Sequence, residues 1–179
     1  MSTKLLERLF PVLGAAPADL NGAATTGDYI SLKNYDRVLV LLAYGDGTAG
    51  SDPALAVYQA TSVAGGSAKV LNCLETGRIY RLDAATYAAY AALTSSTFVW
   101  SKVTQATADE QYAPTDNGET VGIIALEIEA SDLDADNGFD CIRVDVSQAG
   151  AAKYGALIYL LADPKYPAAP ELMKPPIVD

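Results

Sequence analysis

The amino-acid sequence predicts a mainly β protein, an antiparallel β-sandwich or barrel of about eight strands. Short runs of alternating or continuous apolar residues recur along the chain, and Gly, Asp and Pro separate them at short intervals. The sequence has no internal repeat of fixed period, which argues against solenoids and propellers. A length of 179 residues suits one domain. We expect a sandwich domain at residues 27–166, an N-terminal arm at 1–26 and an extended Pro-rich tail at 167–179.

The expected arm begins with the short amphipathic segment KLLERLF and continues in Ala, Gly, Pro and small polar residues. This composition is typical of an extended arm whose apolar residues bind a partner. The same residues fit equally well a first helix that packs on its own domain. An export signal is not expected, because Glu7 and Arg8 interrupt the apolar stretch and Pro11 breaks it.

Four strands are predicted in the first half of the domain. Residues 28–32 form the first, and DRVLVLLAY at 36–44 follows as a nearly continuous apolar run. This run is too short for a typical helix, so it indicates a central strand of a packed sheet. Residues 54–63 alternate between two faces, and AGGS at 64–67 predicts the turn of a hairpin with residues 68–74.

The middle of the chain predicts a short helix at 83–94, with an Asp able to cap it and an Ala-rich body. Its Tyr87 and Tyr90 lie three residues apart. A helix face that packs on the sheet explains this pair more simply than a stacking platform for a ligand. Strand alternation resumes at 96–105, which holds Trp100, and a polar loop follows. Three further strands are expected at residues 121–130, 139–147 and 154–163.

The formal charge of −10 makes nucleic acid an unexpected partner, because an acidic surface repels phosphate backbones. No apolar run approaches the roughly eighteen residues that a membrane helix needs, so no membrane partner is expected either. Cys73 and Cys141 lack metal-ligand spacing, and we expect two buried thiols rather than a disulfide.

The sequence contains no histidine, which removes the usual general base, the usual zinc ligand and every Ser-His or Cys-His nucleophile. An enzyme without histidine needs paired carboxylates or an activated Lys in a cleft, and no spacing here singles out such a pair. We therefore expect neither an enzyme nor a bound cofactor.

Carboxylates at Asp132, Asp134 and Asp136 occupy the first three ligand positions of a helix-loop-helix calcium loop. The pattern then fails, because the required glycine comes one residue late, at Gly138, and Arg143 stands where the bidentate Glu should be. The loop also lies between two predicted strands. A solvated turn is favoured, and the three aspartates are the ligands if a metal binds.

Three blocks of the sequence resemble a group of small virion proteins of tailed bacteriophages, found among the structural genes near the major capsid protein. The blocks are GDYISLKNYDRVLVLL at 27–42, IEASDLDADNGFDCIRVDVSQAG at 128–150 and YGALIYLLADPKY at 154–166. The resemblance covers roughly residues 20 to 166. Its blocks are framework strands and turns, and they contain no catalytic signature.

This resemblance implies a non-enzymatic capsid decoration or cement protein, made in the host cytoplasm and placed on the capsid surface of the virion. It implies the major capsid protein as partner, and shell symmetry favours a homo-oligomer, a trimer. Apolar residues of the arm and tail are the candidate partner-binding residues, although each could instead pack within its own chain. They are Leu5, Leu6, Leu9, Phe10, Leu172, Met173 and Ile177.

Two other roles fit the same residues. A tail, fibre or adaptor component of the virion needs the same kind of domain. A virion-displayed carbohydrate-binding module would stack Tyr87, Tyr90 or Trp100 on sugar rings and use the acidic loop to hold calcium.

Overall fold

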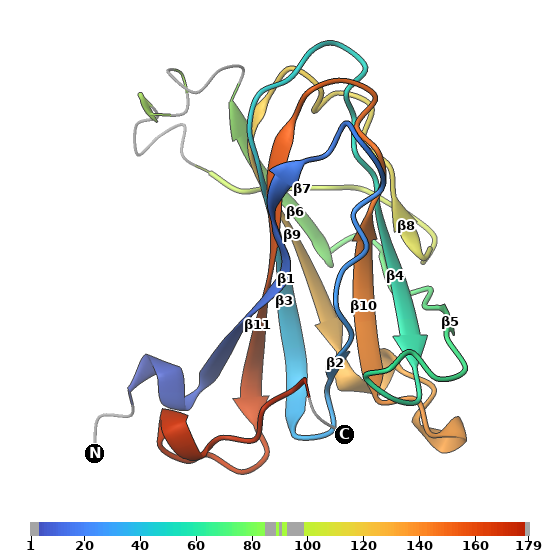
Figure 1. Cartoon of the computed structure of the whole chain (residues 1–179), viewed down its shortest axis with the longest axis vertical. Coiled ribbons are helices and arrows are strands. Elements are labelled where there is room, and N and C mark those ends of the chain that lie inside the picture. Colours follow the sequence, from blue (N-terminus) through green and yellow to red (C-terminus); the bar gives the residue numbers. More distant parts are fainter. Residues whose placement is uncertain (1–3, 85–88, 90, 93–98, 178–179) are drawn as a thin grey trace.

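A computed structural model describes residues 4–84, 89, 91–92 and 99–177. These residues form two antiparallel sheets that face one another as a sandwich (Figure 1). The predicted fold class is confirmed, with eleven strands among the described residues where about eight were expected. The three strands that were not expected are Leu9–Asp19, Ile79–Ala84 and Gln111–Tyr112.

The larger sheet has six strands in the order β1-β11-β3-β9-β6-β7. Its three central strands contain the most apolar runs of the sequence and correspond to the strands predicted at 36–44, 121–130 and 154–163. The strand bounds are β1 (Leu9–Asp19), β11 (Tyr154–Pro164), β3 (Tyr35–Tyr44), β9 (Val121–Glu129), β6 (Ile79–Ala84) and β7 (Ser101–Lys102).

The smaller sheet runs in the order β2-β10-β4-β5, and β8 also pairs with β4. The predicted hairpin is present, with Tyr58 opposite Val70. The strand bounds are β2 (Ile30–Ser31), β10 (Cys141–Val146), β4 (Leu55–Ala60), β5 (Lys69–Val70) and β8 (Gln111–Tyr112). Single 3-10 turns lie at η1 (Leu5–Glu7), η2 (Ala130–Asp132), η3 (Ala135–Asn137) and η4 (Pro170–Leu172).

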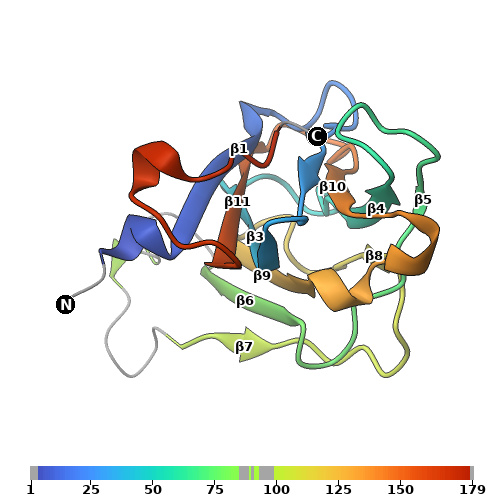
Figure 2. The same cartoon turned by 90° about the horizontal axis from the view of Figure 1, so that it is seen from below.

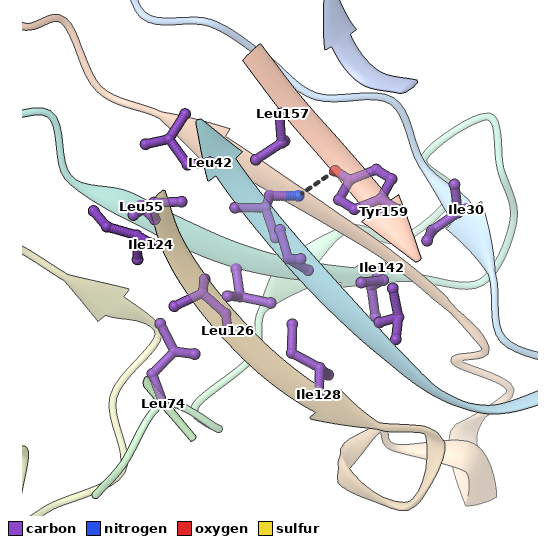
Figure 3. Packing of buried hydrophobic residues seen from close by; sticks show 14 of the residues in the cluster. Ile30, Leu42, Leu55, Leu74, Ile124, Leu126, Ile128, Ile142, Leu157 and Tyr159 are labelled. Atoms are coloured by element: carbon purple, nitrogen blue, oxygen red, sulfur yellow. Dashed lines mark hydrogen bonds between the residues drawn. The ribbon is translucent and has the colours of Figure 1, made fainter. Parts of the chain in front are cut away.

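Branched apolar side chains from both sheets fill the space between them (Figure 3). Leu42 and Ile124 come from the larger sheet, and Leu55 and Ile142 from the smaller one, and none is more than 1% exposed. Cys73 and Cys141 are buried in separate clusters and do not form a disulfide. Burial of this kind provides the main driving force for folding.

The expected arm of residues 1–26 does not extend freely, because Leu9–Asp19 forms β1 at the edge of the larger sheet. Leu9 to Asp19 pair with β11, and two irregularities interrupt the register after Leu13 and after Ala15. Phe10 and Val12 pack against the core. An edge strand tolerates Pro11 and Pro17, because only one side of it must donate to the ladder.

The segment between β1 and β2 crosses from the larger sheet to the smaller one and covers the open side of the sandwich. Thr25 and Val146 exchange two backbone hydrogen bonds of 2.8 Å, and the Asp28 amide donates to the Gly14 carbonyl at 2.9 Å. Gly27 is required at the crossing, because a Cβ there would lie 2.7 Å from the Tyr159 hydroxyl.

The expected Pro-rich tail is extended only in part, because it contains η4 and packs against the domain. Met173 is 6% exposed and belongs to the core. The Tyr35 hydroxyl donates to the Lys174 carbonyl at 2.9 Å, and the Ser31 amide donates to the Pro176 carbonyl at 2.6 Å. Seen from below, the tail therefore crosses from the larger sheet towards β2 (Figure 2).

The region around residues 75–105 differs from the expectation. Residues 79–84 form β6, which the sequence did not predict, and Asp83 pairs with Gly122 inside that strand instead of capping a helix. Most of the helix predicted at 83–94, including Tyr87 and Tyr90, lies outside the described residues. The strand predicted at 96–105 is reduced to β7 in the part that the structure describes.

Candidate interaction surfaces

Exposed leucines from both ends of the chain gather on one side of the sandwich. Leu5 and Leu6 of η1 are 69% and 51% exposed, and Leu172 of η4 is 73% exposed. Both views show η1 and η4 side by side, on the side of the larger sheet that faces away from the smaller one (Figures 1 and 2). We call Leu5, Leu6 and Leu172 the terminal patch.

Packing beneath the terminal patch holds the two chain ends in place. The Phe10 ring meets the buried Tyr35 ring edge-on, with 6.2 Å between centroids. Tyr35 also binds the backbone of the tail at Lys174. One aromatic side chain of β3 therefore contacts both the N-terminal strand and the C-terminal tail, and the patch does not depend on a free arm.

The other candidate partner-binding residues lie elsewhere. Leu9 and Phe10 are half-buried in β1, and Met173 is a core residue, so these side chains serve the chain's own packing. Ile177 is 56% exposed and follows Pro176, which binds β2. Three of the seven predicted residues therefore lie exposed on η1 and η4, which lie side by side.

A second apolar surface covers the larger sheet on the side away from the core. Side chains alternate between the faces of a strand, and those that point outward from the central strands are mainly leucine, isoleucine and alanine, with Arg37, Glu127 and Glu129 at one end. We call this surface the outer face. Its large side chains are Leu13, Leu39, Leu41, Ile123, Ile158 and Leu160.

The outer face has a shallow hollow at one end and a ridge at the other. The hollow has a volume of about 410 Å³, and its lining includes the small residues Ala43 and Ala156 as well as the larger Ile123 and Tyr154. Leu39 and Leu160 lie opposite one another and form the ridge. Glu127 of β9 lies opposite Leu39 and continues the ridge row, and the Arg37 guanidinium, one position further along, pairs with the Glu127 and Asp163 carboxylates at 3.5 and 2.9 Å.

The acidic segment between β9 and β10 is a turn, formed by η2 and η3. Asp132 pairs with Arg78 at 3.2 Å and accepts the Glu129 amide at 2.8 Å. Asp134 pairs instead with Lys69, whose hydrogen bond lowers the pKa of that carboxyl.

Gly138 ends the turn with a φ of 81°, as glycine permits. In the described part of the chain, no three Cys, Asp or Glu side chains lie close enough to hold a metal ion. Asp132, Asp134 and Asp136 are therefore not brought together.

A buried lysine, for which the sequence contains no distinguishing pattern, fixes the loops beside the hollow. The Lys153 Nζ donates to the backbone carbonyls of Asn117, Gly118 and Thr120 at 2.6, 3.0 and 3.1 Å. All three of its donors are used, so the ammonium group acts as a structural clamp. Burial lowers the pKa of Lys153, and nearby carboxylates such as Asp52 oppose that shift.

The aromatic residues proposed for sugar stacking are not shown together. Trp100 is 43% exposed, while Tyr87 and Tyr90 lie outside the described residues. Among the helices that the structure describes, none is long and apolar enough to cross a membrane.

Comparisons with known proteins find only weak structural similarity. No family model matches the chain, and no curated protein matches it. The SPBc2 prophage-derived protein YomS is 7% identical with a TM-score of 0.34, over 84% of this chain and 95% of that one. VP2 of infectious bursal disease virus in T=1 particles is 12% identical with a TM-score of 0.24, over 94% of this chain and 43% of VP2. A VP2 subviral particle gives 11% identity and a TM-score of 0.25, over 96% and 45%. Scores this low carry no argument about function.

Proposed function

We propose that this chain is a structural virion protein of a tailed phage that decorates the head. In this proposal it binds the major capsid protein at the capsid surface, bridges neighbouring capsid subunits and has no enzymatic activity. The terminal patch is the observation that carries the proposal. Exposed apolar residues that lie together mark interaction sites, so three leucines that are more than half exposed on one side favour a binding role.

The resemblance of three sequence blocks to phage virion proteins supports the same role. The blocks coincide with framework elements of the structure, since residues 27–42 contain β2 and most of β3, residues 128–150 contain β10, and residues 154–166 contain β11. The three blocks therefore correspond to the framework of the domain, and the leucines of the terminal patch lie outside them.

Reinforcement by such a protein is mechanical. Burying one exposed leucine side chain against a partner is worth about 1.5–3 kcal/mol. A single copy with three such anchors binds modestly, but displacing a capsid subunit that several copies hold requires all of those contacts to break together. The formal charge of −10 also keeps the protein from competing for packaged DNA.

The direct test is to add purified protein to heads assembled without it and count the bound copies by mass. The wild-type chain is compared with a triple variant, Leu5→Ser, Leu6→Ser and Leu172→Ser. Val70→Ser is the control, because Val70 is an exposed apolar residue of β5 on the other sheet, at 46% exposure. Residues 1–20 should not be deleted as a block, because this removes β1.

The proposal predicts binding of on the order of hundreds of wild-type and Val70→Ser copies per head, as a repeated site on a symmetric shell requires. It predicts at least about 100-fold weaker binding of the triple variant. Binding of only a few copies would place the protein at the tail or its vertex. Equal binding of the triple variant would remove the terminal patch from the account.

A further inference from the structure

The outer face lacks the polar side chains that an antiparallel sheet normally turns to water. In the described part of the larger sheet, charged groups of the central strands are confined to one end, around Arg37 and Glu127. Towards the other end the outward positions of β3, β9 and β11 are apolar. An apolar surface that is continuous over several strands marks a binding site.

We propose that the outer face binds the outer face of a second copy of this chain, which gives a two-fold symmetric dimer. A two-fold contact requires a self-complementary surface, in which residue i of one copy meets residue j of the other and the reverse. The ridge and the hollow provide such a surface, and they lie at opposite ends of the same strands.

The strand register fixes the geometry of the pair. The ridge row joins Leu39 to Leu160 and continues to Glu127 on β9, and the hollow row joins Ala43 to Ala156 and continues to Ile123. Four residues separate the two rows along each strand, which is about 13 Å. Midway lies a third row, in which Ile158 stands opposite both Leu13 and Leu41.

A two-fold axis that lies between the copies and parallel to this middle row places each ridge over the partner's hollow. Leucine side chains of one copy then meet alanines of the other, which lets the two sheets interdigitate at the usual separation of about 10 Å. Residues of the middle row meet their own equivalents across the axis.

The outer face is large enough for a weak, reversible contact. The four strands from β1 to β9 are roughly 19 Å wide, and six residues along them span roughly 20 Å, so each copy offers on the order of 400 Å². A face-to-face pair then buries on the order of 800 Å² in total, which is the size of a transient interface. A second copy also suits a surface whose charges at the ridge, Arg37 and Glu127, already pair within the chain, because a different partner would usually be selected by complementary charge.

The pairing also has a consequence that rests on the proposed function. The axis reverses the strand direction, so the terminal patches of the two copies lie at opposite ends of the dimer. A dimer with two separated patches can bind two capsid subunits at once, and this raises its effective affinity.

The first experiment measures the mass of the purified full chain by sedimentation over a range of concentrations, without heads. We expect a reversible dimer. The double variant Leu41→Thr and Ile158→Thr keeps strand-forming residues while it removes apolar surface at the axis, and should dimerise at least about 100-fold more weakly. Val70→Thr, on the other sheet, should dimerise like the wild type. Near-identical thermal melts of the variants would show that folding is unaffected.

The second experiment locates the axis. Ile158→Cys should be joined to its own equivalent by a short bis-maleimide, which spans a separation that is too long for a disulfide. Val70→Cys should not be joined under the same conditions. Cross-linking through the native cysteines should be low, because Cys73 and Cys141 are 6% and 0% exposed.

Three results would overturn the proposal. They are a monomer at every soluble concentration, a trimer, or a dimer that survives the double variant unchanged. None of them depends on heads. Loss of head binding by a protein that still dimerises would count against the decoration role alone, and a monomer that still coats heads would count against the dimer alone.

Discussion

The Tyr159 hydroxyl of the larger sheet accepts a 3.0 Å hydrogen bond from the Val144 amide of the smaller sheet (Figure 3). Tyr159 is 0% exposed, and β2 pairs with β10 only at Cys141 and Ile142. The tyrosine hydroxyl therefore satisfies a backbone donor that the sheet leaves unpaired. This contact ties the two sheets together at the side where the chain crosses between them.

Replacing Tyr159 with Phe should destabilise the protein by about 1–3 kcal/mol, because it leaves the buried Val144 amide without an acceptor. Tyr154→Phe is the control, since Tyr154 is 67% exposed and should cost less than about 0.5 kcal/mol. Urea unfolding monitored by tryptophan fluorescence measures both. Equal midpoints for the two variants would mean that the amide has another partner.

Ionisation of two buried tyrosines should destabilise the protein from about pH 10 upward. Burial raises the pKa of Tyr44 from 10.0 to about 12, and burial also raises the pKa of Tyr159. In this range the folded state retains protons that the unfolded state releases. The stabilisation is therefore complete below pH 10 and is lost as pH rises towards 12.

Tyr44→Phe removes one of these groups. Between pH 10 and about 12, the free energy of unfolding of the wild type should fall by on the order of 2 kcal/mol more than that of the variant. Urea midpoints at a series of pH values measure the difference. Parallel pH profiles for the two proteins would show that Tyr44 ionises normally in the folded state.

The acidic turn should depend on its ion pair and not on calcium. Asp132→Asn weakens the partly buried contact with Arg78 and should cost about 1–2 kcal/mol. The exposed Asp136→Asn should cost less than about 0.5 kcal/mol. Neither calcium nor a chelator should shift the wild-type melting temperature. A calcium-dependent rise that Asp132→Asn abolishes would establish a metal site.

Neighbouring residues of the tail should behave in opposite ways. Met173→Ala opens a cavity in the core and should cost about 2–4 kcal/mol, whereas Leu172→Ala, at a 73% exposed position, should leave stability within about 0.5 kcal/mol. Only Leu172 belongs to the terminal patch, so only its substitution should weaken head binding without affecting the melt. A similar melting temperature for both variants would contradict the packing of the tail.

Strands whose patterns match the sheet period could be predicted from the sequence. The apolar run at 36–44 and the alternation at 139–147 became β3 and β10. The strand β1 could not be predicted, because Pro11, Gly14 and Pro17 argue against a strand unless it is known to lie at an edge. Its partner β11 lies near the other end of the sequence, so the pairing of the two strands leaves no local pattern in the sequence.

The candidate surfaces could be predicted only in part. Leu5, Leu6 and Leu172 were named from their place near the chain ends, but their gathering depends on β1 and the tail meeting at Tyr35. Met173 has the same local composition around it, and only the fold separates it from Leu172. The outer face did leave a signal, since continuous apolar runs such as DRVLVLLAY are typical of strands covered on both faces. That signal was interpreted as burial within one chain.

Head reinforcement is the central claim, and the rupture temperature of heads tests it most directly. Heads assembled without the protein are heated with wild-type chain, with the triple terminal-patch variant, or with buffer, and DNA release is followed. The account predicts delayed release with the wild-type chain and release close to the buffer control with the variant. Release that is unchanged by a saturating coat of wild-type protein would contradict it.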